Sequence, residues 1–171
     1  MQVRDNTSIE IPNFQSASGS RTWPVTIVDS VVSGHIALTL DLQGGVHLSY
    51  WKNQETTKGQ LFYAQQAGNE WSQEVVTTAQ GAQTAIAVTN GGQLLIAYFD
   101  LDNAQLMLAR KSAIGWEIES VKSSEDASLV SFAPGALCLA IDDQDQPVIT
   151  YYDNDALKLA PSCPPAPSRG S

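Results

Sequence analysis

The chain is poor in cysteine and in basic residues and has no long apolar run, and each shortage excludes a class of protein. Its 171 residues include only Cys138 and Cys163, too few for a disulfide framework. Lys and Arg number 9 against 18 Asp and Glu, which gives a formal net charge of −9, so a phosphate backbone would be repelled and nucleic acid is not an expected partner. The chain has no run of about 18 apolar residues, which is the length that a membrane-spanning helix needs.

The sequence also lacks the short motifs of common enzymes. It has no nucleophile elbow, no Walker loop and no His-Glu-x-x-His. Neither His35 nor His47 has a cysteine or carboxylate at metal-ligand spacing. We therefore expect no enzyme activity, no cofactor and no metal. The stretch from Met1 to Asn6 lacks the apolar core of a signal peptide, so the compartment stays unknown.

What the chain does contain is an internal repeat. Three stretches align without a gap: Ala37 to Tyr50, Ala85 to Tyr98 and Cys138 to Tyr151. Each alternates large and small apolar residues with period two, is interrupted by a turn, and resumes as a second apolar run. This pattern predicts a β-hairpin in each copy. The turns fall at Gly44-Gly45, Gly91-Gly92 and Asp145-Gln146.

Each hairpin is followed by further strand-like segments. A third strand is predicted at Leu61 to Ala64 and at the matching positions of the other copies, and a fourth begins at Trp71 and at Trp116. Trp23 opens a similar segment ahead of the first copy, as a fourth strand without its blade. Four short antiparallel strands that recur roughly every 40 to 50 residues are the spacing of a β-propeller blade.

The predicted fold is therefore all-β, with β-propeller blades of four antiparallel strands and three blades per chain. Residues 21–160 would form this half-propeller, residues 1–20 a flexible N-terminal arm, and residues 161–171 a proline-rich tail or linker.

Three blades are too few to close a ring, because propellers typically have four to eight. The last copy lacks a fourth strand, whereas the Trp23 segment is a fourth strand without the other three. We expect two chains to form a six-bladed ring, in which each lends its Trp23 strand to the partner's unfinished blade. The alternative is that the chain is a piece of a longer propeller.

The chain resembles a family of bacterial β-propeller repeats over about residues 22 to 160. This resemblance implies the propeller fold and an extracellular or cell-surface location, and it says little about activity. The box that marks sialidase-type blades is missing, which disfavours a glycosidase. The matching segments are Val46-His47-Leu48-Ser49-Tyr50, Ala97-Tyr98-Phe99-Asp100, Pro147 to Asp153, Leu61-Phe62-Tyr63-Ala64 and Trp71-Ser72-Gln73-Glu74-Val75.

The candidate ligand site lies in the loops that join second to third strands. Acidic side chains follow an aromatic pair at the same position of two copies, where a carboxylate can bind sugar hydroxyls beside a ring that stacks on the sugar. Alternatively, the acids only cap turns and the tyrosines belong to the core. The predicted ligand-binding residues are Asp100, Asp153, Tyr98, Tyr151, Asp102 and Asn103.

Three further features carry weaker expectations. His47 takes a normally apolar repeat position and is predicted to be buried or to line the channel. An insertion around Ser123 to Pro134 should form a loop on the ligand face. Glu117 and Glu119 lie two apart on one face of an outer strand and are expected to face solvent.

Together these patterns favour a non-catalytic binding module that displays loops on a propeller scaffold, for a glycan or protein ligand. The alternative is a structural or assembly subunit of a larger complex. A glycosidase- or lyase-type propeller enzyme is the least favoured hypothesis.

Overall fold

The computed structural model describes residues 25–30, 34–54, 57–68, 70–81, 83–123, 137–153 and 156–161. Within these ranges the chain forms eleven β-strands and no helix. The strands make three antiparallel sheets, each built from strands that follow one another in the sequence. The all-β prediction is thus confirmed, and the three sheets correspond to three propeller blades.

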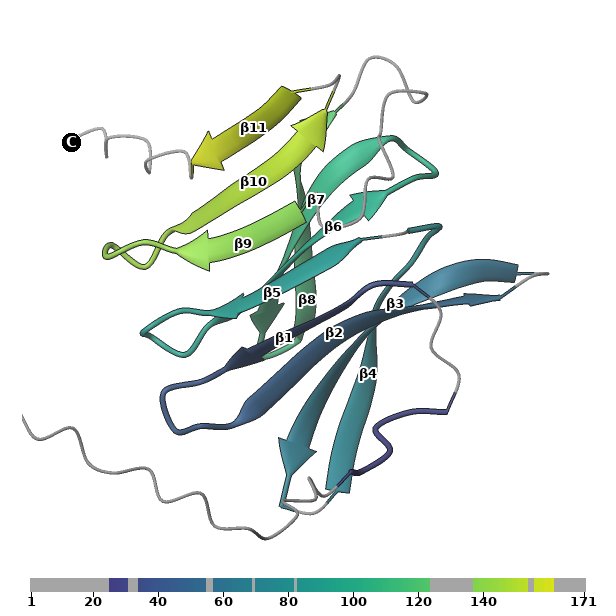
Figure 1. The fold of residues 1–171 in the computed structure, drawn as a ribbon, viewed down its shortest axis with the longest axis vertical. Helices are drawn as coiled ribbons and strands as arrows, with labels where there is room; N and C mark the ends of the chain where they lie inside the picture. The colour runs from purple at the N-terminus through teal and green to yellow at the C-terminus, as the bar shows by residue number, and fades with distance from the viewer. Residues whose placement is uncertain are drawn as a thin grey trace, which may run out of the picture.

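Each blade comprises one copy of the repeat (Figure 1). Blade 1 contains β1 (Ile36–Leu40), β2 (Val46–Gln54), β3 (Thr57–Ala67) and β4 (Glu70–Thr78). Blade 2 contains β5 (Thr84–Val88), β6 (Leu94–Asp100), β7 (Gln105–Ser112) and β8 (Gly115–Ser123). Blade 3 contains β9 (Leu137–Ile141), β10 (Pro147–Asp153) and β11 (Ala156–Pro161).

The blades stack face against face, and their first strands, β1, β5 and β9, lie side by side (Figure 1). We call the face of a blade that is turned toward the preceding blade its leading face, and the opposite one its trailing face. Because side chains alternate along a strand, every blade presents one set of residues on each face. The trailing face of blade 1 packs on the leading face of blade 2, and blade 2 packs on blade 3 in the same way.

Apolar side chains fill both contacts between blades. Burial of each large one contributes roughly 1.5–3 kcal/mol to folding. Between blades 1 and 2 the buried residues include Trp51, Leu61, Tyr63, Ile86, Ile96 and Tyr98. Between blades 2 and 3 they include Leu95, Leu108, Leu137, Ile149 and Tyr151.

The turn between the first two strands has the same construction in all three blades. Asp41, Thr89 and Asp142 open it, and a side-chain oxygen of each accepts a hydrogen bond from a backbone N–H further along the turn. The fourth residue of each turn has a positive φ, 81° at Gly44, 82° at Gly92 and 62° at Asp145. The three predicted turns are therefore confirmed, and two of these left-handed positions carry the glycine that they favour.

Asp145, whose backbone is in the left-handed conformation, connects two blades through its side chain. Its carboxylate accepts hydrogen bonds from the backbone N–H groups of Asn90 (2.7 Å) and Gly91 (2.9 Å) in the turn of blade 2. Glycine, which stands at the matching position of the other two turns, could not make this link. The turn of blade 3 is thereby held against that of blade 2.

The two predicted fourth strands are present as β4 and β8, with Trp71 and Trp116 near their starts. The Trp116 indole packs edge-on against Tyr63 of blade 1, with 5.6 Å between ring centroids, and its Nε1–H donates to Glu74 Oε1 at 3.1 Å. Trp116 therefore fixes blade 2 to blade 1.

Replacement of Trp116 by alanine is expected to lower the free energy of unfolding by about 3 kcal/mol, because it removes an aromatic contact between blades and leaves a cavity. Urea denaturation followed by circular dichroism measures this change. A loss below about 0.5 kcal/mol, the size of an ordinary surface substitution, would show that the ring does not hold the blades together.

Several expectations concern residues that lie outside the described ranges. These are the arm at 1–20, Trp23 itself, residues 124–136 of the insertion and the tail from 162 onward. Residues 25–30 are described, and in this single chain they do not form the expected strand. Pairing of two chains in a ring stays a prediction.

Candidate functional site

Two grooves open between neighbouring blades, on the side of the molecule that carries the turns between the first two strands. Groove 1–2, between blades 1 and 2, has a volume of about 470 Å³. Groove 2–3, between blades 2 and 3, has a volume of about 300 Å³. The predicted site residues Asp100, Asp102 and Asn103 lie at the end of β6 and in the turn after it, at the opposite end of blade 2. The sequence-based prediction therefore concerned the other face.

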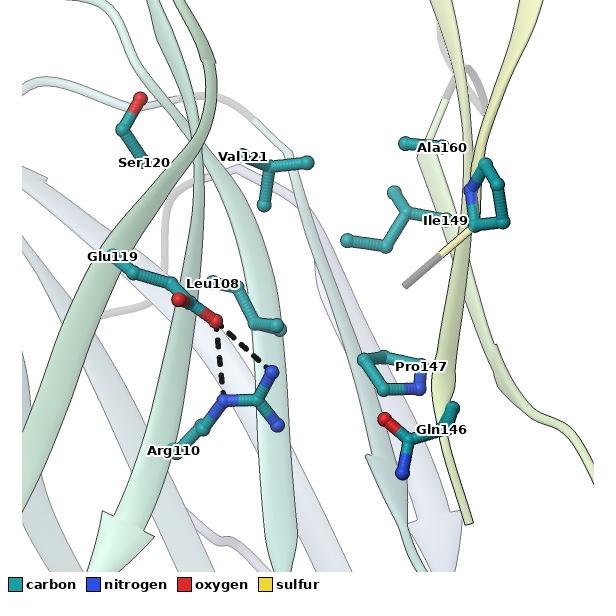
Figure 2. Close-up of a pocket in the computed structure, with 10 residues that line it drawn as sticks. Leu108, Arg110, Glu119, Ser120, Val121, Gln146, Pro147, Ile149 and Ala160 are labelled. Atoms are coloured by element: carbon teal, nitrogen blue, oxygen red, sulfur yellow. Dashed lines mark hydrogen bonds and ion pairs between the residues drawn. The ribbon is translucent and has the colours of Figure 1, made fainter. Parts of the chain in front are cut away.

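The two walls of groove 2–3 differ in chemistry. Figure 2 shows side chains of blade 2 facing those of blade 3 across the opening. The wall from blade 2 is polar and charged at its centre, whereas that from blade 3 is largely apolar. Blade 2 contributes Leu108, Arg110, Glu119, Ser120 and Val121, and blade 3 contributes Gln146, Pro147, Ile149, Ala160 and Pro161.

Strand pairing places Arg110 and Glu119 together. Leu108 pairs with Glu119 across β7 and β8, and Arg110 lies two residues further along the same face. Arg110 donates to Glu119 Oε1 through Nε at 3.1 Å and through Nη2 at 2.9 Å. The side chains are 30% and 59% exposed, so the pair contributes about 0–1 kcal/mol to stability. Its donors and acceptors lie within reach of a ligand.

Pro147, Ile149 and Ala160 form the facing wall, with the Gln146 amide at its edge (Figure 2). The groove therefore offers hydrogen-bonding groups on one side and C–H surface on the other. A ligand that fits must have polar groups at its rim and an apolar face. A sugar ring has both.

Groove 1–2 contains a hydrogen-bond network that satisfies its own polar groups. His47 is buried, as predicted, and its Nδ1 lies 2.7 Å from the hydroxyl oxygen of Tyr63. Its Nε2 lies 3.2 Å from Asp41 Oδ2. Burial raises the pKa of Tyr63 to about 12, so the phenol stays neutral at ordinary pH. These hydrogen bonds connect β2 and β3 to the first turn and leave fewer polar groups free to bind a ligand.

The carboxylates at matching positions of blades 1 and 2 also differ. Glu74 of blade 1 corresponds to Glu119 of blade 2, since each comes three residues after the tryptophan of its strand. Glu74 Oε1 binds the Lys111 ammonium and the Trp116 indole of the next blade. Glu119 is bound only by Arg110 among the described residues. Groove 2–3 is therefore the better candidate for a ligand site.

The tyrosines of the predicted site lie in the core between blades. Tyr98 packs edge-on against Trp51, with centroids 5.9 Å apart, and Tyr151 packs in the same manner against Phe99 at 6.5 Å. Both rings are buried. Desolvation raises the pKa of Tyr98 to about 12.

The acidic residues of the predicted site make local contacts. Asp100 is 9% exposed and accepts hydrogen bonds from the backbone N–H of Asn103 at 3.2 Å and from its Nδ2 at 2.8 Å. Asp102 forms an ion pair with Lys58 at 3.2 Å. Asp153 ends β10, and its side chain is outside the described part of the chain. Ligand binding by this set stays a prediction.

These contacts give Asp100 a measurable structural role. Replacement of Asp100 by alanine is expected to lower the free energy of unfolding by about 1–2 kcal/mol, because two hydrogen bonds to a carboxylate are lost. Asn103→Ala, which removes one of the two, should cost less. Urea denaturation of both variants measures the difference, and an unchanged midpoint for Asp100→Ala would rule out turn capping.

Sequence reasoning missed the Arg110 and Glu119 pair. Glu119 was expected to face solvent, and it is exposed, but it also lines groove 2–3. Arg110 was not singled out. A usable signal was present, because a tight turn after Ser112 pairs β7 with β8 and brings opposite charges to one face.

The chain matches no known family and has a low-identity structural similarity to a solved protein. No protein-family model matches the chain, and no curated protein matches it. One similar solved structure is a fucose lectin from Kordia zhangzhouensis in complex with methyl-fucoside, with 14% sequence identity and a TM-score of 0.45. The match covers 73% of this chain and 90% of the lectin chain. Among the described residues, no helix is long and apolar enough to cross a membrane, and no cluster of His, Cys, Asp and Glu could hold a metal ion.

Proposed function

We propose that this chain is a non-catalytic carbohydrate-binding module and that groove 2–3 holds its ligand. The observation that carries this proposal is the Arg110 and Glu119 pair, half open to solvent and facing the apolar wall of Pro147 and Ile149. Because the pair is exposed, it adds little to stability, and its hydrogen-bonding groups are accessible to a ligand.

The chemistry of the pair suits vicinal hydroxyl groups. A guanidinium presents several N–H donors in a rigid fork, and a carboxylate only accepts, so the two together can bind adjacent hydroxyls that each donate and accept. Both Arg110 donors converge on Oε1, and Glu119 Oε2 accepts no hydrogen bond from a described residue. The Arg110 charge is balanced by Glu119, which favours a neutral sugar over an anionic one.

The size of the groove limits the ligand. Its volume of about 300 Å³ is at the lower end of small-molecule sites, so it would hold one or two sugar rings. The apolar C–H face of a ring would lie against Pro147, Ile149 and Ala160. The rest of a longer glycan would extend into solvent.

A glycan array followed by titration calorimetry tests the proposal. The folded protein should bind a set of neutral glycans that share a terminal sugar, and the corresponding free monosaccharide should bind with micromolar to millimolar affinity. Failure of the folded chain to bind any neutral glycan at millimolar concentration would overturn the proposal. Binding of a protein partner only, detected by pull-down, would favour the assembly subunit.

A further inference from the structure

Residues Val25 to Ser30, here called the leading segment, contact the leading face of blade 1 through Val28 and Asp29. Val28 packs into the cluster around Leu48 and Tyr50, and its carbonyl accepts a hydrogen bond from Gln73 Nε2 at 2.5 Å. The Tyr50 hydroxyl donates to Asp29 Oδ2 at 2.8 Å. Asp29 also forms an ion pair with Lys52. Burial alone would raise the pKa of the Asp29 carboxyl, but the contacts with Lys52 and Tyr50 outweigh burial and lower this pKa.

The leading segment repeats the contacts that β4 makes with blade 2. Val28 comes eight residues before the first strand of blade 1, and Val76 comes eight residues before the first strand of blade 2. Val76 packs into the cluster that contains Tyr98, the counterpart of Tyr50, and the next residue, Thr77, hydrogen-bonds Tyr98 as Asp29 bonds Tyr50. The segment therefore lies where the outer strand of a preceding blade would lie.

In the described part of the chain, the segment at this outer-strand position belongs to no sheet. The leading segment is not a strand and pairs with none of the described strands. At the other end of the molecule, β11 is an edge strand among the described strands, and it occupies the place of a third strand in blade 3 (Figure 1). In blades 1 and 2 the third strand pairs with a fourth. An open edge of this kind is a template for pairing with another chain.

The two end faces are incomplete as well. Leu157 on the trailing face of blade 3 is 77% exposed, whereas Leu61 at the same position of blade 1 is fully buried against blade 2. On the leading face of blade 1, Leu38 is 61% exposed, whereas its counterpart Ile86 is 6% exposed. Further apolar residues that are exposed on these faces are Ile36, Leu40 and Leu159.

We propose that a second copy of this chain covers these surfaces. The trailing face of blade 3 in each copy packs on the leading face of blade 1 in the other, as the blades already do twice within one chain. The leading segment pairs along β11 of the partner copy as its fourth strand, with Thr26 opposite Leu159 of the partner subunit. Two such contacts related by a two-fold axis close a ring of six blades.

A second copy is favoured over another protein because one chain carries both halves of the contact. One end has a segment in the place of a fourth strand and a leading face, and the other has an open third strand and a trailing face. This inference goes beyond the proposed function, since each chain contains groove 2–3 complete, and glycan binding and assembly can fail separately.

Light scattering after size-exclusion chromatography gives the first test. At micromolar concentration the protein should have twice the chain mass of 18.4 kDa. Leu159→Glu should reduce the mass to that of one chain, and the variant should stay folded because the leucine is exposed within the chain. Ile114→Glu, in the turn between β7 and β8, is the matched control and should leave the dimer intact. A single-chain mass for the unaltered protein, or any mass above two chains, would overturn the proposal.

Disulfide cross-linking tests the register. With Cys138 and Cys163 replaced by serine, Thr26→Cys combined with Leu159→Cys should give a covalent dimer on oxidation, seen on a non-reducing gel. Thr26→Cys with Ile114→Cys should give none. Equal cross-linking of both pairs, or of neither in a protein of dimer mass, would contradict the proposed strand pairing.

Discussion

Glu119→Gln is expected to weaken glycan binding by about tenfold to a hundredfold, the loss that accompanies removal of a charge from a hydrogen bond. The free energy of unfolding should change by less than about 0.5 kcal/mol, because Glu119 is a surface residue. Arg110→Ala should remove binding below detection, since it deletes the donors and leaves the Glu119 carboxylate without its cation. Calorimetry with a monosaccharide identified on the array measures both effects.

Two further variants serve as controls. Glu70→Gln makes the same charge change at an exposed residue of the fourth strand of blade 1, and Glu70 does not line groove 2–3, so binding should be unchanged. Arg110→Lys keeps the charge but loses the planar fork and should bind weakly. Equal affinity in the unaltered protein, Glu119→Gln and Arg110→Ala would exclude groove 2–3 as the ligand site.

Gly81→Ala is expected to destabilise the protein by about 3 kcal/mol, the upper part of the usual range for overpacking. A Cβ at Gly81 would lie 2.0 Å from Cζ2 of Trp51 and 2.3 Å from its Cη2. The Trp51 ring is rigid and fully buried, and its Nε1–H is held by the carbonyl of Gln83, so it cannot move aside. Chemical denaturation measures the loss.

Comparison of the blades suggests a second substitution that should partly restore the stability of Gly81→Ala. Phe99 stands in blade 2 where Trp51 stands in blade 1, so phenylalanine is compatible with a blade at this position. Trp51→Phe alone should be destabilising because it leaves space beside Gly81. Combined with Gly81→Ala, it should recover at least about 1 kcal/mol of the loss expected from simple addition. Additive effects would mean that the two residues do not interact.

The strands and turns were predictable because their causes are local. Alternation of large and small residues specifies which side chains face a neighbouring blade, and the left-handed turn position in each hairpin requires glycine or a tolerant residue. The placement of Asp145 in a turn followed from the repeat, but its bonds to the turn of blade 2 did not. Contacts between blades depend on how sheets stack, which no single repeat specifies.

The candidate site could not be predicted from the sequence, because it also depends on how neighbouring blades stack. Arg110 and Glu119 belong to one hairpin, but the groove that they line exists only because Pro147 and Ile149 of the next blade face them. Tyr98 and Tyr151 were predicted as ligand-binding residues instead, because aromatic rings beside acidic residues are typical of sugar sites. Their burial shows that the same pattern also serves the contact between blades.

The two grooves also show how one scaffold can differ between repeats. Gln65 and Glu74 take the positions of Arg110 and Glu119 in blade 1, and there the carboxylate binds Lys111 and Trp116 of the next blade. The carboxylate at this position holds blade 2 against blade 1 in one copy and lines groove 2–3 in the other.

Mapping of amide chemical shifts by NMR during titration with the bound monosaccharide would locate the ligand site. If groove 2–3 binds the sugar, the shifts should be concentrated at Arg110, Glu119, Gln146 and Ile149, on both walls of the groove. Shifts concentrated at Asp100, Asp102, Asn103 and Asp153, with the groove unchanged, would contradict this proposal and place the ligand on the opposite face.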